Sequence, residues 1–153
     1  MVYVLALLIG VVAGLRAMTA PAAVSWAAKL GWLSLQGSPL AFLGFAITPY
    51  IFTVLALVEL VTDQLPATPS RKVPVQFGAR LVSGALCGAA IGAAGGSLVG
   101  GLVAGVVGAV IGTLGGAELR GALAKAFGRD MPAAFIEDAV AIVAAIAIVR
   151  LAA

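Results

Sequence analysis

Long apolar segments alternate with short polar interruptions along this chain of 153 residues. A helix that crosses a bilayer needs about 20 mostly apolar residues. Charges and clusters of proline and glycine divide the sequence into five predicted membrane-spanning helices, at about 2–29, 39–62, 75–95, 98–119 and 132–151. The pattern predicts an all-α integral membrane protein, with about five transmembrane helices in a single transmembrane domain over residues 1–153.

Helix breakers interrupt the first two of these segments. Arg16 and Pro21 lie in the middle of the first segment, which is also long for one span, so we expect a broken first helix. If this broken segment enters the membrane and returns, four or six spans replace five. Pro49 lies inside the second segment and predicts a bend there.

Glycines recur in a four-residue register through the uncharged run from Leu81 to Ala117, at Gly84, Gly88, Gly92, Gly96 and Gly100, then at Gly108, Gly112 and Gly116. Each glycine in a soluble helix costs about 1 kcal/mol relative to alanine. In lipid, the same register gives a flat stripe on which a second helix packs closely, as in a glycine zipper. The run is too long for one span, so we expect a helical hairpin that turns near 95–97 or 100–101. The glycine stripes exceed what one small bundle uses, which predicts a homo-oligomer.

The composition supports a membrane class and excludes several kinds of chemistry. Hydrophobic residues make up 63% of the chain, charged residues 10%, and the mean hydropathy is +1.19. The net charge of +3 comes from scattered residues, so no nucleic-acid surface is expected. Histidine is absent and Cys87 is the one cysteine, which excludes an internal disulfide, His-ligated haem and a Cys-His or Ser-His pair. We expect no cofactor.

Basic residues are unevenly divided between the two ends of the predicted spans. One end has only Lys29 and Arg150, whereas the other has six: Arg71, Lys72, Arg80, Arg120, Lys125 and Arg129. Because basic residues favour the cytoplasmic side, this distribution predicts a multi-pass protein with a cytoplasmic N-terminus.

Four carboxylates are expected at the same basic-rich end. Glu59 and Asp63 lie four residues apart on one helical face, and Glu137 and Asp138 begin the last span from the same side. Like charges so placed would repel one another unless a cation or a nearby arginine compensates; Arg71, Arg80 and Arg120 are candidates. Glu59 falls within an apolar run, where an ionised side chain facing lipid is costly, so it should face the protein interior.

Arg16 is likewise an ionised side chain within an apolar segment, the first of the chain. A buried arginine costs about 2.5–3.5 kcal/mol on membrane-insertion scales, so it requires a partner or a watery cavity. Thr19 and the expected bend at Pro21 would expose backbone groups, which membranes tolerate only in the protein interior or beside a cavity. Residues 14–21 are therefore a candidate wall of a binding site.

Structural interpretations of these residues stay open beside the functional one. Arg16 is as well explained by an ion pair joining two helices as by a substrate contact. Glu59 with Asp63 suits an ion or substrate site, an interhelical salt bridge or the membrane interface. Glu137 and Asp138 also suit a helix N-terminus. The basic residues in the connections between spans suit a role in orienting the protein in the membrane and in contacting anionic lipid.

Several of these pieces resemble a family of small bacterial inner-membrane proteins known as domain-of-unknown-function family 4126. The similar pieces are Gly14-Leu-Arg-Ala-Met-Thr-Ala-Pro21, Glu59-Leu-Val-Thr-Asp-Gln-Leu-Pro-Ala-Thr-Pro-Ser-Arg71, Gly78-Ala-Arg80, Gly112-Thr-Leu-Gly-Gly116 and Ile136-Glu-Asp138. The resemblance covers nearly the whole chain. It implies a bacterial inner-membrane location and no particular mechanism.

Together the pattern predicts a small transporter or channel in contact with the lipid bilayer, acting on an ion or small solute. The candidate substrate-binding residues are Arg16, Thr19, Glu59, Asp63, Arg71, Arg80, Glu137 and Asp138. One alternative is a membrane-embedded enzyme that acts on phosphorylated lipid through a divalent cation. Another is a non-catalytic membrane scaffold. A non-enzymatic role is favoured, and no metal is assigned.

Overall fold

The computed structural model describes residues 1–62 and 73–153, which form six α-helices and one short 3-10 helix and contain no β-strand. The elements are α1 (Val2–Leu15), α2 (Thr19–Lys29), η1 (Ala41–Gly44), α3 (Thr48–Thr62), α4 (Pro74–Ala94), α5 (Leu98–Phe127) and α6 (Asp130–Ala152). The prediction of an all-α protein is confirmed.

Three of these helices, α4, α5 and α6, are long and apolar enough to cross a membrane. The apolar helices α1 and α3 are shorter. The membrane class predicted from composition is therefore supported, whereas the number of spans stays a prediction.

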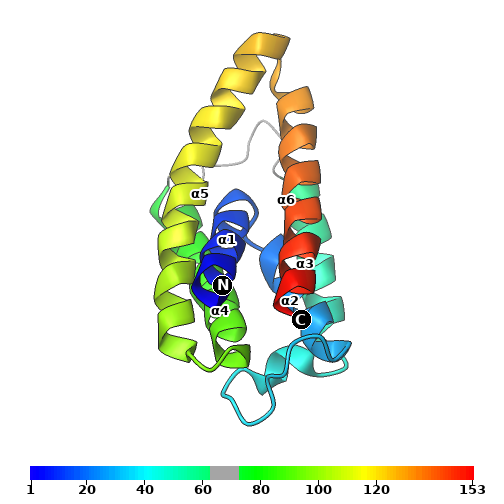
Figure 1. Ribbon diagram of the computed structural model, residues 1–153. Coiled ribbons are helices and arrows are strands. Elements are labelled where there is room, and N and C mark those ends of the chain that lie inside the picture. The colour runs from blue at the N-terminus through cyan, green and yellow to red at the C-terminus, as the bar shows by residue number, and fades with distance from the viewer. Residues whose placement is uncertain (63–72) are drawn as a thin grey trace.

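The two longest helices, α5 and α6, form the long sides of the bundle in Figure 1 and are joined at its upper end. Helix α5 packs along α1 and α4, and α6 contacts α5, α1 and α2. Helix α3 packs against α2. The core consists mainly of small and aliphatic side chains from α1, α2, α4 and α6, of which Ile9, Val24, Cys87 and Ala141 are fully buried.

Glycines bring the backbones of α4 and α5 close together. A Cβ atom added to Gly88 would lie 2.7 Å from the Cα of Gly105, and one added to Gly92 would lie 2.7 Å from the Cα of Gly101. Real side chains are not found at such distances, so only glycine permits this approach. The turn between the two helices consists of residues 95–97, and Gly96 has a φ of 89°, which glycine adopts without strain.

Further along α5, glycines on nearly the same face of the helix pack on α1 in the same way. Added Cβ atoms at Gly108 and Gly112 would collide with the backbone of α1 at Leu7 and Val11. The four-residue glycine register is thus used to a large extent within one chain, by two neighbours of the same helix.

The first predicted segment is divided into α1 and α2 at Arg16, which has extended backbone geometry with φ −141° and ψ 113°. The Tyr3 hydroxyl donates to Ser97 at 3.0 Å, so α1 begins near the α4–α5 turn. Lys29, at the end of α2, lies over the Tyr50 ring, and the Arg150 guanidinium lies 4.6 Å from the centre of the Trp32 ring. Helices α1 and α2 thus run in opposite directions, and both have their outer ends at the end of the bundle where α6 finishes.

One sequence prediction about helix shape is wrong. Pro49 does not bend a span, because it is the second residue of α3, where its missing N–H has no helical partner to lose. The helix that contains the predicted span 98–119 continues to Phe127, because Glu118 and Arg120 are good helix formers and remain compatible with a helix that extends past the apolar region. Gly128, with a φ of 76°, ends it.

Candidate functional site

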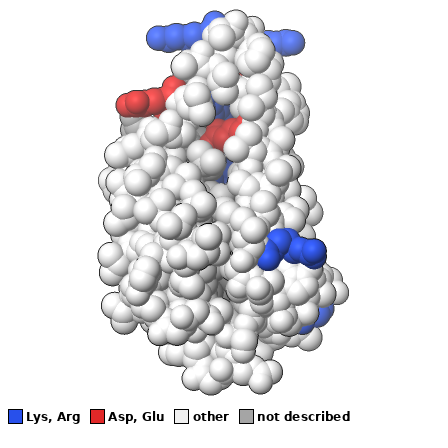
Figure 2. Space-filling view, viewed as in Figure 1, with Lys and Arg blue, Asp and Glu red and all other residues white. Residues whose placement is uncertain are grey.

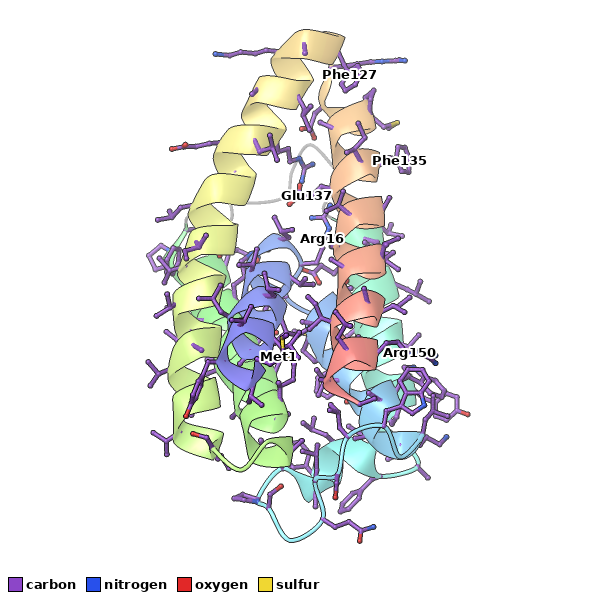
Figure 3. The ribbon with its side chains drawn as sticks, viewed as in Figure 1. Met1, Arg16, Phe127, Phe135, Glu137 and Arg150 are labelled. Carbon is purple, nitrogen blue, oxygen red and sulfur yellow. The ribbon has the colours of Figure 1, made fainter. Side chains whose placement is uncertain are left out.

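The break between α1 and α2 lies inside the bundle and is surrounded by charged and hydroxyl side chains from α3, α4, α5 and α6. Figure 3 shows Arg16 close to α6, with Glu137 above it between α5 and α6. Arg80, which also reaches the break, is six residues into α4, or about 9 Å along that helix. The polar cluster therefore lies below the end of the bundle, among helices that are apolar elsewhere.

Arg16 is fully buried and pairs with Asp138 of α6. Its Nε donates to Asp138 Oδ1 at 2.6 Å, and its Nη2 contacts the same oxygen. Asp138 is 8% exposed. Since a buried charge without a partner would be strongly unfavourable, this pair explains how an arginine is tolerated at the centre of the fold.

Glu59 of α3 binds the backbone at the start of α2. The N–H of Ala17 donates to Oε1 and the N–H of Met18 donates to Oε2, both at 2.7 Å. Arg80 Nη2 is 3.9 Å from Oε1. The carboxylate thus accepts two backbone donors that the helix itself leaves unpaired, at the end where the helix dipole favours a negative charge.

The carbonyl groups at the break are bound from the other side. The Gly14 carbonyl accepts hydrogen bonds from Arg80 Nη1 at 2.7 Å and from the Thr113 hydroxyl at 3.4 Å. The Ala17 carbonyl accepts a hydrogen bond from the Ser83 hydroxyl. Backbone groups freed by a broken helix must find partners in a membrane, and here side chains from α3, α4 and α5 supply them.

A second group of charges lies between the upper halves of α5 and α6. Arg120 donates to Asp130 through Nε at 3.0 Å and Nη2 at 2.7 Å, and its Nη1 is 3.6 Å from Glu137 Oε2. Arg120 and Glu137 also line a recess of about 60 Å³ whose other walls are mainly apolar. Figure 2 shows charged atoms at the bottom of an opening in this part of the surface.

The structure brings together five of the predicted site residues: Arg16, Glu59, Arg80, Glu137 and Asp138. Thr19 is the first residue of α2, and its buried hydroxyl oxygen has no hydrogen-bond partner among the described residues. Asp63 and Arg71 lie outside the described residues.

The interpretation of Glu137 and Asp138 as a helix N-terminus is wrong. Helix α6 begins at Asp130, and the first-turn acidic residue is Asp130 itself. Glu137 and Asp138 are about two turns further along, beyond the reach of the helix terminus. Both are buried and directed at arginines instead.

The sequence analysis missed the contributions of Ser83 and Thr113 to the site and named Arg120 only as a candidate to compensate the carboxylates. A signal for the two hydroxyl residues exists, because they are rare polar side chains in the uncharged glycine-rich run. Their spacing from the break could not be derived without knowing how α4 and α5 pack against α1.

The charged side chains at the site are arranged as ion pairs. Among residues 1–62 and 73–153, no group of three or more His, Cys, Asp or Glu side chains is arranged to hold a metal ion. The buried guanidinium groups of Arg16 and Arg80 and the partly buried one of Arg120 each lie within 4.0 Å of a carboxylate.

Over the described residues, fold and site together define an all-helical protein with three helices long and apolar enough to cross a membrane, in which a broken helix is held by a buried, charge-paired cluster. No protein-family model matches the chain, and comparisons with curated proteins and with solved structures also give no match.

Proposed function

We propose that the protein is a small membrane transporter or channel for an ion or small solute, and that its polar site is the cluster around the break between α1 and α2. The observation that carries this proposal is the set of contacts at the break, where Glu59, Arg80 and Thr113 bind backbone atoms of residues 14–18. Discontinuous helices whose ends meet near the middle of the membrane are a recurrent way to build substrate sites in transporters.

Burial of the charges supports an occluded state of such a site. Arg16 is fully buried and Arg80 is 2% exposed, so neither is open to bulk solvent in this conformation. Two hollows lie beside the cluster: the recess at Arg120 and Glu137, and a larger groove of about 190 Å³ between α2, α3 and α6. Exchange with either side then requires a change in helix packing, as alternating access demands.

Transport is tested with the purified protein in liposomes. Light scattering under gradients of potassium chloride, potassium formate and glycerol, with valinomycin to carry K⁺, should detect solute entry above that of empty liposomes. We expect Arg80→Gln and Arg16→Lys to lower this flux at least about tenfold, because one removes a buried positive charge and the other removes the planar guanidinium geometry.

Exposed residues supply matched controls for that experiment. Arg129→Gln and Glu118→Gln remove one charge of each sign from exposed positions and should leave the flux unchanged. Only variants that elute as one species and melt near the native temperature are compared. Flux equal to that of empty liposomes for every solute, or equal flux in all four variants, would contradict the proposal.

We further propose that the basic-rich end is cytoplasmic in a bacterial inner membrane, as the resemblance to domain-of-unknown-function family 4126 implies. Since Tyr3 lies beside Ser97, the first helix then starts at the opposite face, and α1 and α2 enter the membrane and return. This arrangement replaces the predicted cytoplasmic N-terminus in our proposal.

Single-cysteine labelling distinguishes the two arrangements. In a Cys87→Ala background, we expect Tyr3→Cys and Ser34→Cys to react with an impermeant maleimide from the same face, and Lys125→Cys from the other. The reason is that Tyr3 lies in the first turn of α1 and Ser34 lies just after α2, whereas Lys125 lies near the α5–α6 connection. Labelling of Tyr3→Cys and Lys125→Cys from the same face would instead support five spans and a cytoplasmic N-terminus.

Homo-oligomer formation also belongs to this proposal. Positions such as Gly115 and Gly121 on α5 face open space, so a second helix could approach them closely. The scaffold alternative is favoured by one observation, the pairing of Arg16, Arg80 and Arg120 with carboxylates, and it predicts no flux for any solute.

A further inference from the structure

The N-terminus of α2 has the features of an anion-binding site, and the group that fills it is a side chain of the same protein. Two adjacent backbone N–H groups, on Ala17 and Met18, point at the two oxygens of one carboxylate at 2.7 Å each. Helix α2 has 11 residues, so its N-terminus carries the partial positive charge of an established helix. The carboxylate belongs to Glu59, which reaches the site from α3.

Nearby positive charge strengthens this site. Arg80 Nη2 lies 3.9 Å from Glu59 Oε1, and Arg16 occupies the position immediately before Ala17. Asp138 compensates Arg16. If the Glu59 carboxylate left, the two N–H groups would lose their acceptor and Arg80 would lose a neighbouring negative charge. Such a site favours a replacement anion, because buried charges and donors are costly without partners.

A second observation points to a ligand independently. Thr19, the next residue but one after Ala17, is 7% exposed, and its hydroxyl oxygen has no hydrogen-bond partner among the described residues. Buried hydroxyl groups in proteins are normally hydrogen-bonded. An anion seated at the start of α2 would give this hydroxyl an acceptor within the same helical turn.

The groove between α2, α3 and α6 reaches this end of α2 at Thr19. Thr19 lines the groove, together with Ala56 and Leu60 of α3, which flank Glu59 in sequence. The other hydroxyl on its wall, that of Thr53, is already used, since it donates to the Pro49 carbonyl and accepts from Trp26. The volume of about 190 Å³ suits a small solute.

We propose that the Glu59 carboxylate is an internal ligand of an anion site at the start of α2, and that the transported substrate is a small monovalent anion of the carboxylate class that takes its place. The identity of the substrate rests on the proposed transport function, whereas the anion site does not. A carboxylate of formate or acetate size reproduces the pair of oxygens that the two N–H groups now bind.

The test uses the full chain purified in detergent and the anion formate. Glu59→Ala removes the internal ligand and should lower the melting temperature. Sodium formate should then raise the melting temperature of Glu59→Ala by about 4 °C or more in a saturable manner, compared with sodium sulfate at equal ionic strength, and should leave the native protein unchanged. Glu59→Gln is the matched control, because its amide still fills the site and should show no such response.

A substitution of Thr19 distinguishes anion binding from a purely structural role of Glu59. Thr19→Val in the Glu59→Ala background should raise the formate concentration at half-effect at least threefold, because the hydroxyl donor to the anion is lost. If Glu59→Ala is not recovered as a single species, recovery from membranes extracted in formate is compared with recovery in sulfate; recovery only in formate supports the site.

The proposal is overturned if formate stabilises the native protein and Glu59→Ala equally, stabilises neither, or fails to recover the variant. These outcomes are separable from the failure of transport. Stabilisation by formate without flux would keep the anion site and reject the transporter, whereas flux without any formate response would keep the transporter and reject the site.

Discussion

Replacement of Arg16 by glutamine should lower the free energy of unfolding by about 3–5 kcal/mol, because it leaves Asp138 buried without its charge partner. The pair joins residues far apart in the chain, through the 2.6 Å bond from Arg16 Nε to Asp138 Oδ1. Arg16 is fully buried, so water cannot take over its role. The loss is measured by thermal or denaturant unfolding in detergent.

Arg129→Gln is the control for this experiment. It removes the same charge at an exposed position and should change the stability by less than about 0.5 kcal/mol. Equal stability of the Arg16→Gln and Arg129→Gln proteins would show that the buried pair is not a structural element of the fold.

A valine at Gly105 should destabilise the protein by about 3 kcal/mol, because α5 has no space for a side chain there. A Cβ at this position would lie 2.9 Å from the Cα of Gly88 and would collide with the carbonyl of Gly84. The backbone carbonyl of Gly105 also lies close to Gly10 of α1. The substitution therefore pushes α5 away from α4, and this loss exceeds the gain in helix propensity on removing glycine, which is below about 1 kcal/mol.

Gly115→Val is the matched control on the same helix. Nothing lies within 4 Å of a Cβ at Gly115, so this change should be neutral or slightly stabilising. The comparison is made by unfolding both variants in the same detergent. If Gly105→Val were as stable as Gly115→Val, the close packing of α1, α4 and α5 would be contradicted.

The gathering of Arg16, Glu59, Glu137 and Asp138 could be predicted from the sequence because of one physical constraint. Ionised side chains within apolar segments cannot face lipid, so they are forced into the same protein interior. The constraint predicts that the charges meet, and the structure places Arg16, Glu59 and Asp138 at the break and Glu137 in the neighbouring group with Arg120.

The pairing within that cluster could not be predicted in the same way. Asp138 and Glu137 are adjacent in sequence, and the helical rotation that directs one to Arg16 and the other to Arg120 depends on how α6 packs. The role of Glu59 was also hidden, because its hydrogen-bond donors are backbone N–H groups that become available only where the chain breaks.

The helix boundaries could likewise be predicted only in part from the sequence. The break near Arg16 follows from the local sequence, since a charge and a proline interrupt an apolar run. The direction of α2 after the break does not, because it depends on contacts with α3 and α6 that are remote in sequence. Local signals thus indicate the position of the break, whereas tertiary packing sets the direction of α2 after it.

The charge-paired break depends on the pairing of Arg16 with Asp138, and a double-mutant cycle measures the energy of this pairing. Unfolding is followed for the native protein, Arg16→Gln, Asp138→Asn and the double variant in one detergent. We predict a coupling energy of about 2 kcal/mol or more, because each single change leaves a buried polar partner unsatisfied and the double change removes both. Single effects that add to within about 0.5 kcal/mol in the double variant would contradict the pairing, and with it the charge-paired break at the centre of the fold.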